Sequence, residues 1–92
     1  MTETENNNRI DAKQAAANAI SYYEYITQDN RSEALIEEIE LNDDDQWMIT
    51  LSHRDPNQNS MIYGAQGLNR KYKTFLIDAY TGEVESMKIK KI

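Results

Sequence analysis

The C-terminal part of the chain carries its strongest folding signal. Residues 72–78 and 84–89 read as two β-strands, and a tight turn joins them. Asp78 is suited to accept hydrogen bonds from turn amides, and Gly82 can adopt the left-handed backbone that other residues resist. We therefore predict a β-hairpin with its turn at Asp78–Gly82.

The two faces of this hairpin differ in composition. Phe75 and Ile77 share one face, and Tyr72, Leu76 and Tyr80 are predicted on the other. The return strand contributes further apolar side chains and ends in a lysine-rich segment. These apolar residues are Val84, Met87 and Ile89.

A helix is predicted from residue 11 to residue 27. Apolar residues recur there at helical spacing: Ala12, Ala16, Ala19, Ile20, Tyr23 and Ile26. Asp11 is placed to cap the helix, with Gln14 in the capping-box position and Ile10 as a hydrophobic staple. Because alanine is small, this stripe predicts close packing of the helix on a sheet.

Three tyrosines, Tyr22, Tyr23 and Tyr25, lie within four positions near the end of this helix. They point in more than one direction, so at least one is expected to face solvent or a partner. The others either pack on the sheet or form a ligand platform near Trp47.

Two more strands are predicted in the middle of the chain. Residues 35–41 are expected to form an edge strand, where glutamates discourage aggregation; a short helix over 32–39 is the alternative. A turn at 42–45 leads into residues 46–54, where Trp47, Ile49 and Leu51 alternate with polar or smaller side chains and should face the helix.

Residues 55–69 are expected to form a long loop with the only proline and two of the three glycines. Loops of this length tend to be mobile or functional. Met61, Ile62 and Tyr63 within it are either a recognition element or an extension of the flanking strands.

These elements predict one α+β domain over residues 11–92, a single helix packed on a four-stranded antiparallel sheet, after a disordered lead-in over 1–10. Ninety-two residues leave little room for more than one helix and one sheet.

Charge and composition restrict the partners. The net charge of −6 divides into −9 over residues 1–45 and +3 over 46–92, and there is no basic stripe of the kind nucleic acid requires. No segment has the length and apolarity of a membrane helix. The polar start of the chain and the absence of cysteine predict a cytoplasmic protein that binds neither nucleic acid nor membrane.

The residues that could support catalysis are sparse, so we expect no enzyme, metal or cofactor. His53 is the single histidine and is expected to be solvated at a strand end, and no cysteine is available for a zinc site. Asp43, Asp44 and Asp45 lack the spacing of a calcium loop, so a solvated turn is expected instead.

The stretch Phe75-Leu76-Ile77-Asp78-Ala79-Tyr80-Thr81-Gly82-Glu83-Val84 resembles the closing hairpin of the PepSY family. The alanine-rich helix and the strand that begins at Trp47 extend this resemblance. It implies a cystatin-like layout and a role in binding and restraining peptidases. Asp78, Thr81 and Gly82 carry over as structural positions.

A single helix cannot cover both faces of a sheet. Apolar side chains on the other face would therefore be exposed, and exposed apolar area often marks an interface. We predict a non-catalytic interaction module that docks a protein partner or forms a homodimer; a small-ligand sensor is the alternative. The predicted contact residues are Met48, Tyr72, Leu76 and Tyr80, with Met61, Ile62 and Tyr63 of the loop.

Overall fold

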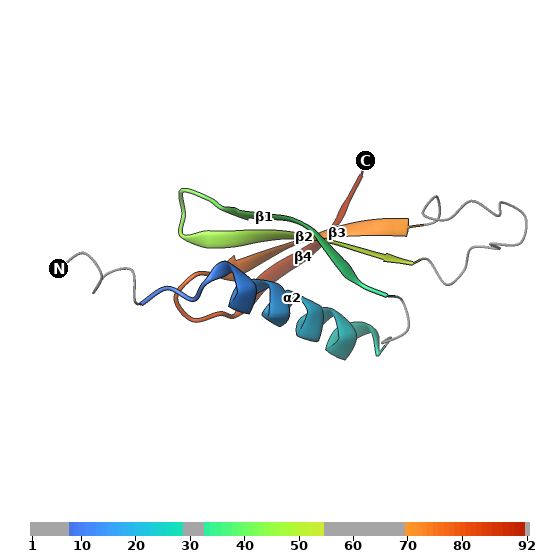
Figure 1. Ribbon diagram of the computed structural model, residues 1–92, viewed down its shortest axis with the longest axis horizontal. Helices are drawn as coiled ribbons and strands as arrows, with labels where there is room; N and C mark the ends of the chain where they lie inside the picture. The colour runs from blue at the N-terminus through green and yellow to red at the C-terminus, as the bar shows by residue number, and fades with distance from the viewer. Residues whose placement is uncertain (1–7, 29–32, 55–69, 92) are drawn as a thin grey trace, which may run out of the picture.

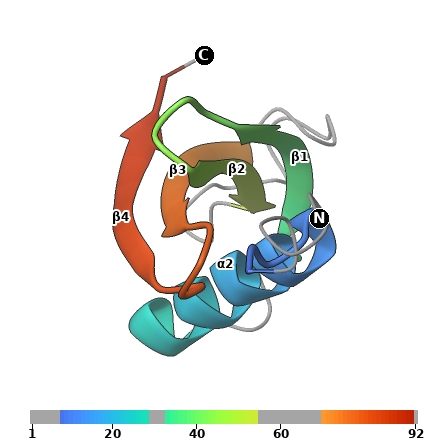
Figure 2. The same ribbon diagram turned by 90° about the vertical axis from the view of Figure 1, so that its left-hand side faces the viewer.

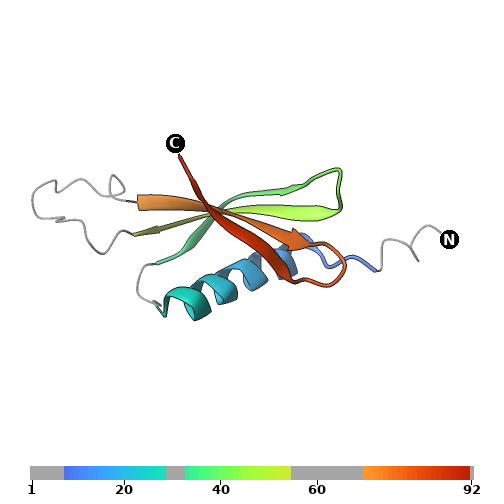
Figure 3. The same ribbon diagram turned by 180° about the vertical axis from the view of Figure 1, so that it is seen from behind.

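One helix and four strands make up the fold. The computed structural model describes residues 8–28, 33–54 and 70–91. The elements are α2 (Ala12–Thr27), β1 (Leu35–Leu41), β2 (Gln46–Arg54), β3 (Arg70–Asp78) and β4 (Val84–Lys90). The strands form one antiparallel sheet in the order β1-β2-β3-β4. Figures 1 and 3 show α2 along one side of this sheet, which confirms the predicted α+β layout.

Helix α2 begins and ends where local chemistry requires. The Gln14 amide donates to Asp11 Oδ1 at 2.8 Å, so Asp11 is the N-cap. The Gln14 side chain donates to Asn18 Oδ1 rather than completing a capping box. At the other end Gln28 takes a left-handed backbone (φ 58°) and its amide bonds to the Glu24 carbonyl, which terminates the helix.

The buried face of α2 is rotated slightly from the predicted stripe. Ala15, Ala19 and Tyr23 are its buried residues, whereas Ile26 is 47% exposed. The prediction that Ile26 belongs to the packed stripe is therefore wrong. Alanines stand both on the predicted stripe and beside it. The sequence alone therefore does not determine, to within one position, which residues of α2 face the sheet.

Strand β1 is an edge strand, as predicted, and the alternative helix over 32–39 is wrong. It pairs with β2 through Ile39 opposite Ile49 and Leu41 opposite Trp47, with an irregularity between Ile36 and Glu38. Figure 2 views the sheet from one end, with β1 and β4 at its two sides and α2 against one face.

The core lies between α2 and the two central strands. Ile49 and Leu51 of β2 and Phe75 and Ile77 of β3 have no exposed surface. They pack against the alanines of α2, and Tyr22 meets Phe75 edge to face at 6.4 Å between ring centroids. This confirms the predicted helix-facing side of both strands.

Two hydrogen bonds hold Ile10, just before α2, against the sheet, and a third joins the two hairpin turns. The Ile10 amide donates to the Ala79 carbonyl at 2.7 Å, and Trp47 Nε1 donates to the Ile10 carbonyl at 3.0 Å. The Ala79 amide in turn donates to the Asp45 carbonyl at 3.0 Å. Residues distant in sequence therefore meet at one end of the sheet, where Figure 1 shows the β3–β4 turn beside the start of α2.

The β3–β4 turn has the predicted chemistry. Asp78 Oδ1 accepts hydrogen bonds from the Tyr80 and Thr81 amides at 2.7 and 2.9 Å, and Gly82 has φ +79°. The Thr81 and Tyr80 amide bonds lower the pKa of Asp78 below its usual value. Asn18 Nδ2 of α2 donates to the Gly82 carbonyl at 3.0 Å, which holds the turn against the helix.

His53 differs from the expectation of a solvated side chain. It is 7% exposed and its ring lies on Tyr23, with centroids 5.0 Å apart. The prediction was wrong because β2 continues under α2 to its last turn, so His53 takes the next inward position after Leu51. The predicted turn residues 29–32 and the loop 55–69 lie outside the described residues.

Replacement of Phe75 by alanine tests the core. We expect the free energy of unfolding to fall by about 3–5 kcal/mol, because a fully buried aromatic ring is removed. Urea denaturation followed by circular dichroism measures the change. Tyr25→Ala is the matched control, since Tyr25 is 74% exposed and should lose less than about 0.5 kcal/mol; equal losses would contradict the described core.

Substitutions at Gly82 and Gln28, which both have a left-handed backbone, should affect stability differently. A β-carbon on Gly82 would lie 2.9 Å from Asn18 Nδ2, so Gly82→Ala should destabilise the protein by about 1–2 kcal/mol. Gln28→Gly should instead be neutral or stabilising, because glycine adopts the C-cap backbone without strain. Thermal unfolding of both variants tests the pair, and equal melting temperatures would refute it.

Candidate partner-binding face

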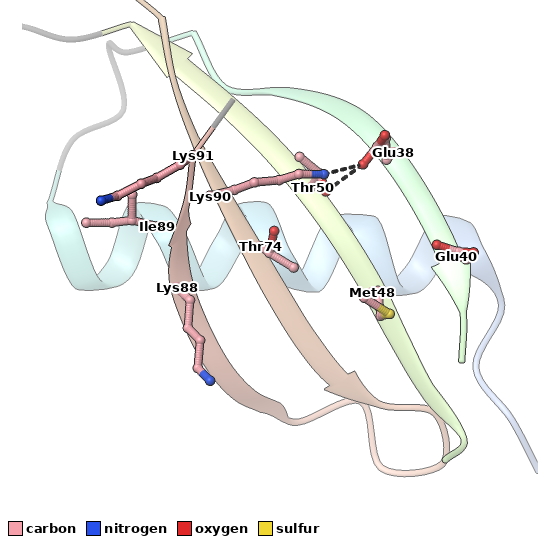
Figure 4. A pocket seen from close by; sticks show the side chains of 9 residues that line it. All are labelled: Glu38, Glu40, Met48, Thr50, Thr74, Lys88, Ile89, Lys90 and Lys91. Atoms are coloured by element: carbon pink, nitrogen blue, oxygen red, sulfur yellow. Dashed lines mark hydrogen bonds and ion pairs between the residues drawn. The ribbon is translucent and has the colours of Figure 1, made fainter. Parts of the chain in front are cut away.

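The sheet has a second face, turned away from α2, which we call the open face. Side chains alternate along each strand, so the neighbours of the core residues in β2 and β3 point there. Cross-strand pairs order them in rows: Met48 opposite Leu76, Thr50 opposite Thr74, and Ser52 opposite Tyr72. Figure 4 shows the middle of this face with α2 behind the sheet.

A charged bridge crosses the open face from one edge strand to the other. Lys90 of β4 donates from Nζ to Glu38 Oε1 of β1 at 2.7 Å, and the Thr50 hydroxyl donates to the same oxygen at 3.1 Å. Three strand spacings, roughly 14 Å, separate these edges. The Lys90 side chain is therefore extended over the central strands to reach Glu38 (Figure 4).

This bridge favours the ionised form of the Glu38 carboxyl group. The Lys90 hydrogen bond lowers the pKa of Glu38 below its usual 4.5, and the Thr50 hydrogen bond and the positive charge of Lys90 act in the same direction.

A second polar cluster closes over Ser52. Its hydroxyl donates to Glu37 Oε2 at 2.7 Å and accepts from Arg70 Nε at 3.0 Å. Arg70 also donates from Nη2 to the carbonyls of Glu33 and Ser52, at 2.7 and 3.1 Å. These contacts explain why Ser52 has no exposed surface although α2 does not cover it.

Between these groups the open face is hollowed into a groove of about 450 Å³. Met48, Thr50 and Thr74 form its floor, glutamates of β1 line one side and lysines of β4 the other (Figure 4). The complete lining is Glu38, Glu40, Met48, Thr50, Thr74, Lys88, Ile89, Lys90 and Lys91.

The structure brings only some of the predicted contact residues together. Met48 and Leu76 are directly opposite each other and half-buried on the open face. Tyr72 lies on the same face, but the Thr50–Thr74 row separates it from them. The open face is therefore apolar at two places, with a polar row between them.

The remaining predicted residues lie elsewhere. Tyr80 is 45% exposed and lies in the turn after β3, not in a strand. The reason is that the chain leaves the sheet at Asp78 to form the turn. Met61, Ile62 and Tyr63 fall outside the described residues.

The groups that dominate the groove were missed by sequence reasoning. Glu38, Thr74 and Lys90 were assigned to strands but not to a site. Their meeting depends on register, which pairs Glu38 with Thr50 and Tyr72 with Lys90 across the sheet. The available signal was the contrast between an acidic first edge strand and a basic last one.

The groove offers binding chemistry of three kinds. It presents carboxylates, ammonium groups and threonine hydroxyls around a thioether floor. In the described ranges 8–28, 33–54 and 70–91, no three histidine, aspartate or glutamate side chains lie close enough to hold a metal ion. No helix in these ranges is long and apolar enough to cross a membrane.

Two of the three tyrosines near the end of α2 pack between the helix and the sheet. Tyr23 is 2% exposed, Tyr22 packs on Phe75, and Tyr25 is 74% exposed, which confirms that at least one faces outward. Tyr22 and Tyr23 therefore occupy the space between helix and sheet where a ligand platform was the alternative.

Comparisons of the chain with protein-family models, with curated proteins and with solved structures gave no match. The resemblance to the PepSY family therefore stays a prediction that depends on the hairpin residues.

The pKa of Glu38 provides a direct test of the bridge. In a carboxyl-detected NMR titration we expect Lys90→Met to raise this pKa toward 4.5, and Thr50→Val to raise it less, because Lys90 supplies the larger effects. An unchanged pKa in Lys90→Met would mean that the bridge does not form in solution.

The lowered pKa of Glu38 also determines how the stability of the fold depends on pH. A carboxyl whose pKa is lower in the folded state stabilises the fold above the unfolded value of 4.5, and this stabilisation is lost as the pH falls through the folded pKa. Glu38→Gln should therefore be less stable than the native chain at pH 7, with the difference vanishing in acid. Denaturation curves at several pH values measure it.

Proposed function

We propose that the chain is a non-catalytic protein-interaction module that binds an extended segment of a partner protein in the open-face groove. The observation that carries this proposal is that α2 covers one face of the sheet while the other holds a groove with charged sides. Conformational preorganisation supports the proposal, because the Glu38–Lys90 bridge and the sheet hold the groove residues in place before any partner arrives.

The chemistry of the groove favours an extended peptide. Met48 and Thr74 form its accessible floor beside the Glu38–Lys90 bridge, which covers Thr50, and its two sides carry opposite charges. A segment with an apolar residue between a basic and an acidic one would meet a complementary group at each position. Recognition of this kind gives specificity rather than great affinity.

The PepSY resemblance gives this module a candidate role as a peptidase inhibitor or regulator. Asp78, Thr81 and Gly82, which carry the resemblance, build the β3–β4 turn and stay structural. We therefore place the binding function on the open face and not in that turn, and keep the cytoplasm as the proposed location.

A homodimer through the open face is the other arrangement predicted from the sequence. It would place two copies of the same groove against each other, with Leu76 and Met48 near the contact. Light scattering coupled to size exclusion tests it: Leu76→Asp should reduce a dimeric mass to that of one chain. Equal masses would exclude this arrangement.

A small-molecule ligand is the second candidate, since about 450 Å³ lies within the range of small-ligand sites. A metabolite that occupies the groove should raise the melting temperature through mass action. Loss of that increase in Thr74→Arg would favour the sensor over the interaction module.

Partner capture tests the main proposal. Native chain immobilised on beads should retain a partner protein from the host extract, and Thr74→Arg should reduce the retained amount at least tenfold, because the long side chain fills the groove floor. Tyr25→Arg is the matched control on the exposed side of α2 and should retain the partner. Retention by Thr74→Arg together with loss in Tyr25→Arg would place the interface on the helix and contradict the proposal.

A further inference from the structure

The two edge strands of the sheet are complementary to each other. β1 presents Glu38 and Glu40 on the open face, and β4 presents Lys88 and Lys90 on the same face. Each edge also exposes an isoleucine: Ile39 is 42% exposed and Ile89 is 74% exposed. Exposed edges with apolar side chains are sites where a further strand can be added.

The regular parts of these edges match in length and direction. Strands alternate in direction through the order β1-β2-β3-β4, so β1 of a second copy placed beside β4 continues the sheet in antiparallel fashion. The irregularity of β1 lies between Ile36 and Glu38, and that of the β3–β4 pair lies at Ile77 and Val84. Residues 38–41 of β1 and 87–90 of β4 lie outside these two irregular places and are regular strand.

One antiparallel alignment of these two segments gives every residue a favourable cross-strand partner. With Ile39 opposite Ile89, Glu40 is opposite Lys88 and Glu38 is opposite Lys90. Leu41 then lies opposite Met87 on the side that faces α2. Cross-strand pairs of opposite charge and of apolar side chains are the favourable ones in sheets.

Twofold pairing of identical edges lacks this complementarity. Two β1 strands paired antiparallel about Ile39 would place Glu38 opposite Glu40, and two β4 strands about Ile89 would place Lys88 opposite Lys90. Like charges directly opposite are destabilising. The charges therefore favour a heterologous contact over an isologous one, and a heterologous contact leaves one free edge at each end.

We propose that copies of this chain associate head to tail, with β1 of one copy added to β4 of the next through residues 38–41 and 87–90. Glu40 and Lys88 are the groups with most to gain, because in the described part of the chain neither has an opposite charge as a partner. This proposal goes beyond the groove function and does not depend on it.

Charge exchange across the edges tests the contact. In sedimentation velocity over a concentration series, the mass of the native chain should rise past two copies without a plateau. Glu40→Lys and Lys88→Glu should each weaken association about tenfold, because a repulsive pair replaces an attractive one. An equimolar mixture of the two variants, and the double variant, should restore association.

Each other result overturns the proposal. A native chain of single mass up to its solubility limit, a plateau at two copies, or single variants that associate like the native chain would all contradict it. Circular dichroism checks that the variants are folded. Salt is a poorer probe, because it screens both the edge attraction and the repulsion between chains of net charge −6.

Cross-linking tests the register independently, since the chain has no cysteine. Ile39→Cys mixed with Ile89→Cys should give a disulfide between the two variants under mild oxidation, because directly opposite residues have β-carbons at suitable separation. Each variant alone should stay largely uncoupled. Efficient 39–39 or 89–89 linkage, identified by mass spectrometry of linked peptides, would indicate twofold pairing and overturn the proposal.

The groove variant separates this contact from the proposed function. Thr74 lies on central strand β3, so Thr74→Arg should reduce partner capture at least tenfold and still allow the 39–89 cross-link to form. Absence of the 39–89 cross-link, together with partner capture by the native chain, would refute the edge contact alone.

Discussion

The structure depends on the close packing of one alanine-rich helix face against two central strands. Ala15 and Ala19 leave space for Ile49, Leu51, Phe75 and Ile77, and all six are without exposed surface. A chain of this length can build one such layer and no second. Everything on the opposite side of the sheet follows from that limit, because β2 and β3 must there satisfy their side chains without a covering helix.

The open face meets this requirement with polar groups from the sheet edges. Thr50 is 5% exposed because Glu38 and Lys90 meet above it, and Ser52 is buried by Glu37 and Arg70. Long side chains commonly cover neighbouring surface in this way. The acidic half and the basic half of the sequence thus supply opposite sides of one surface.

Most of the fold was predictable from local sequence, but the candidate site was not. Alternation at Trp47, Ile49 and Leu51, the Asp11 cap and the Asp78–Gly82 turn each act over a few residues, so the helix, the four strands and their faces could be predicted. Glu38 and Lys90 are 52 positions apart, and their contact depends on three strand registers at once. His53 was mistaken because strand ends are not usually buried, whereas β2 here extends beneath α2.

The bond between the Ile10 amide and the Ala79 carbonyl has a consequence for synthesis of the protein. Helix α2 is made before its anchors at Ala79 and Gly82, and the Asn18–Gly82 contact spans 64 positions of the chain. Contacts of such high sequence separation form slowly and cannot form on an incomplete chain. The nascent helix must therefore remain without these anchors until residues 79–82 have also been synthesised, so α2 leaves the ribosome before the turn that holds it.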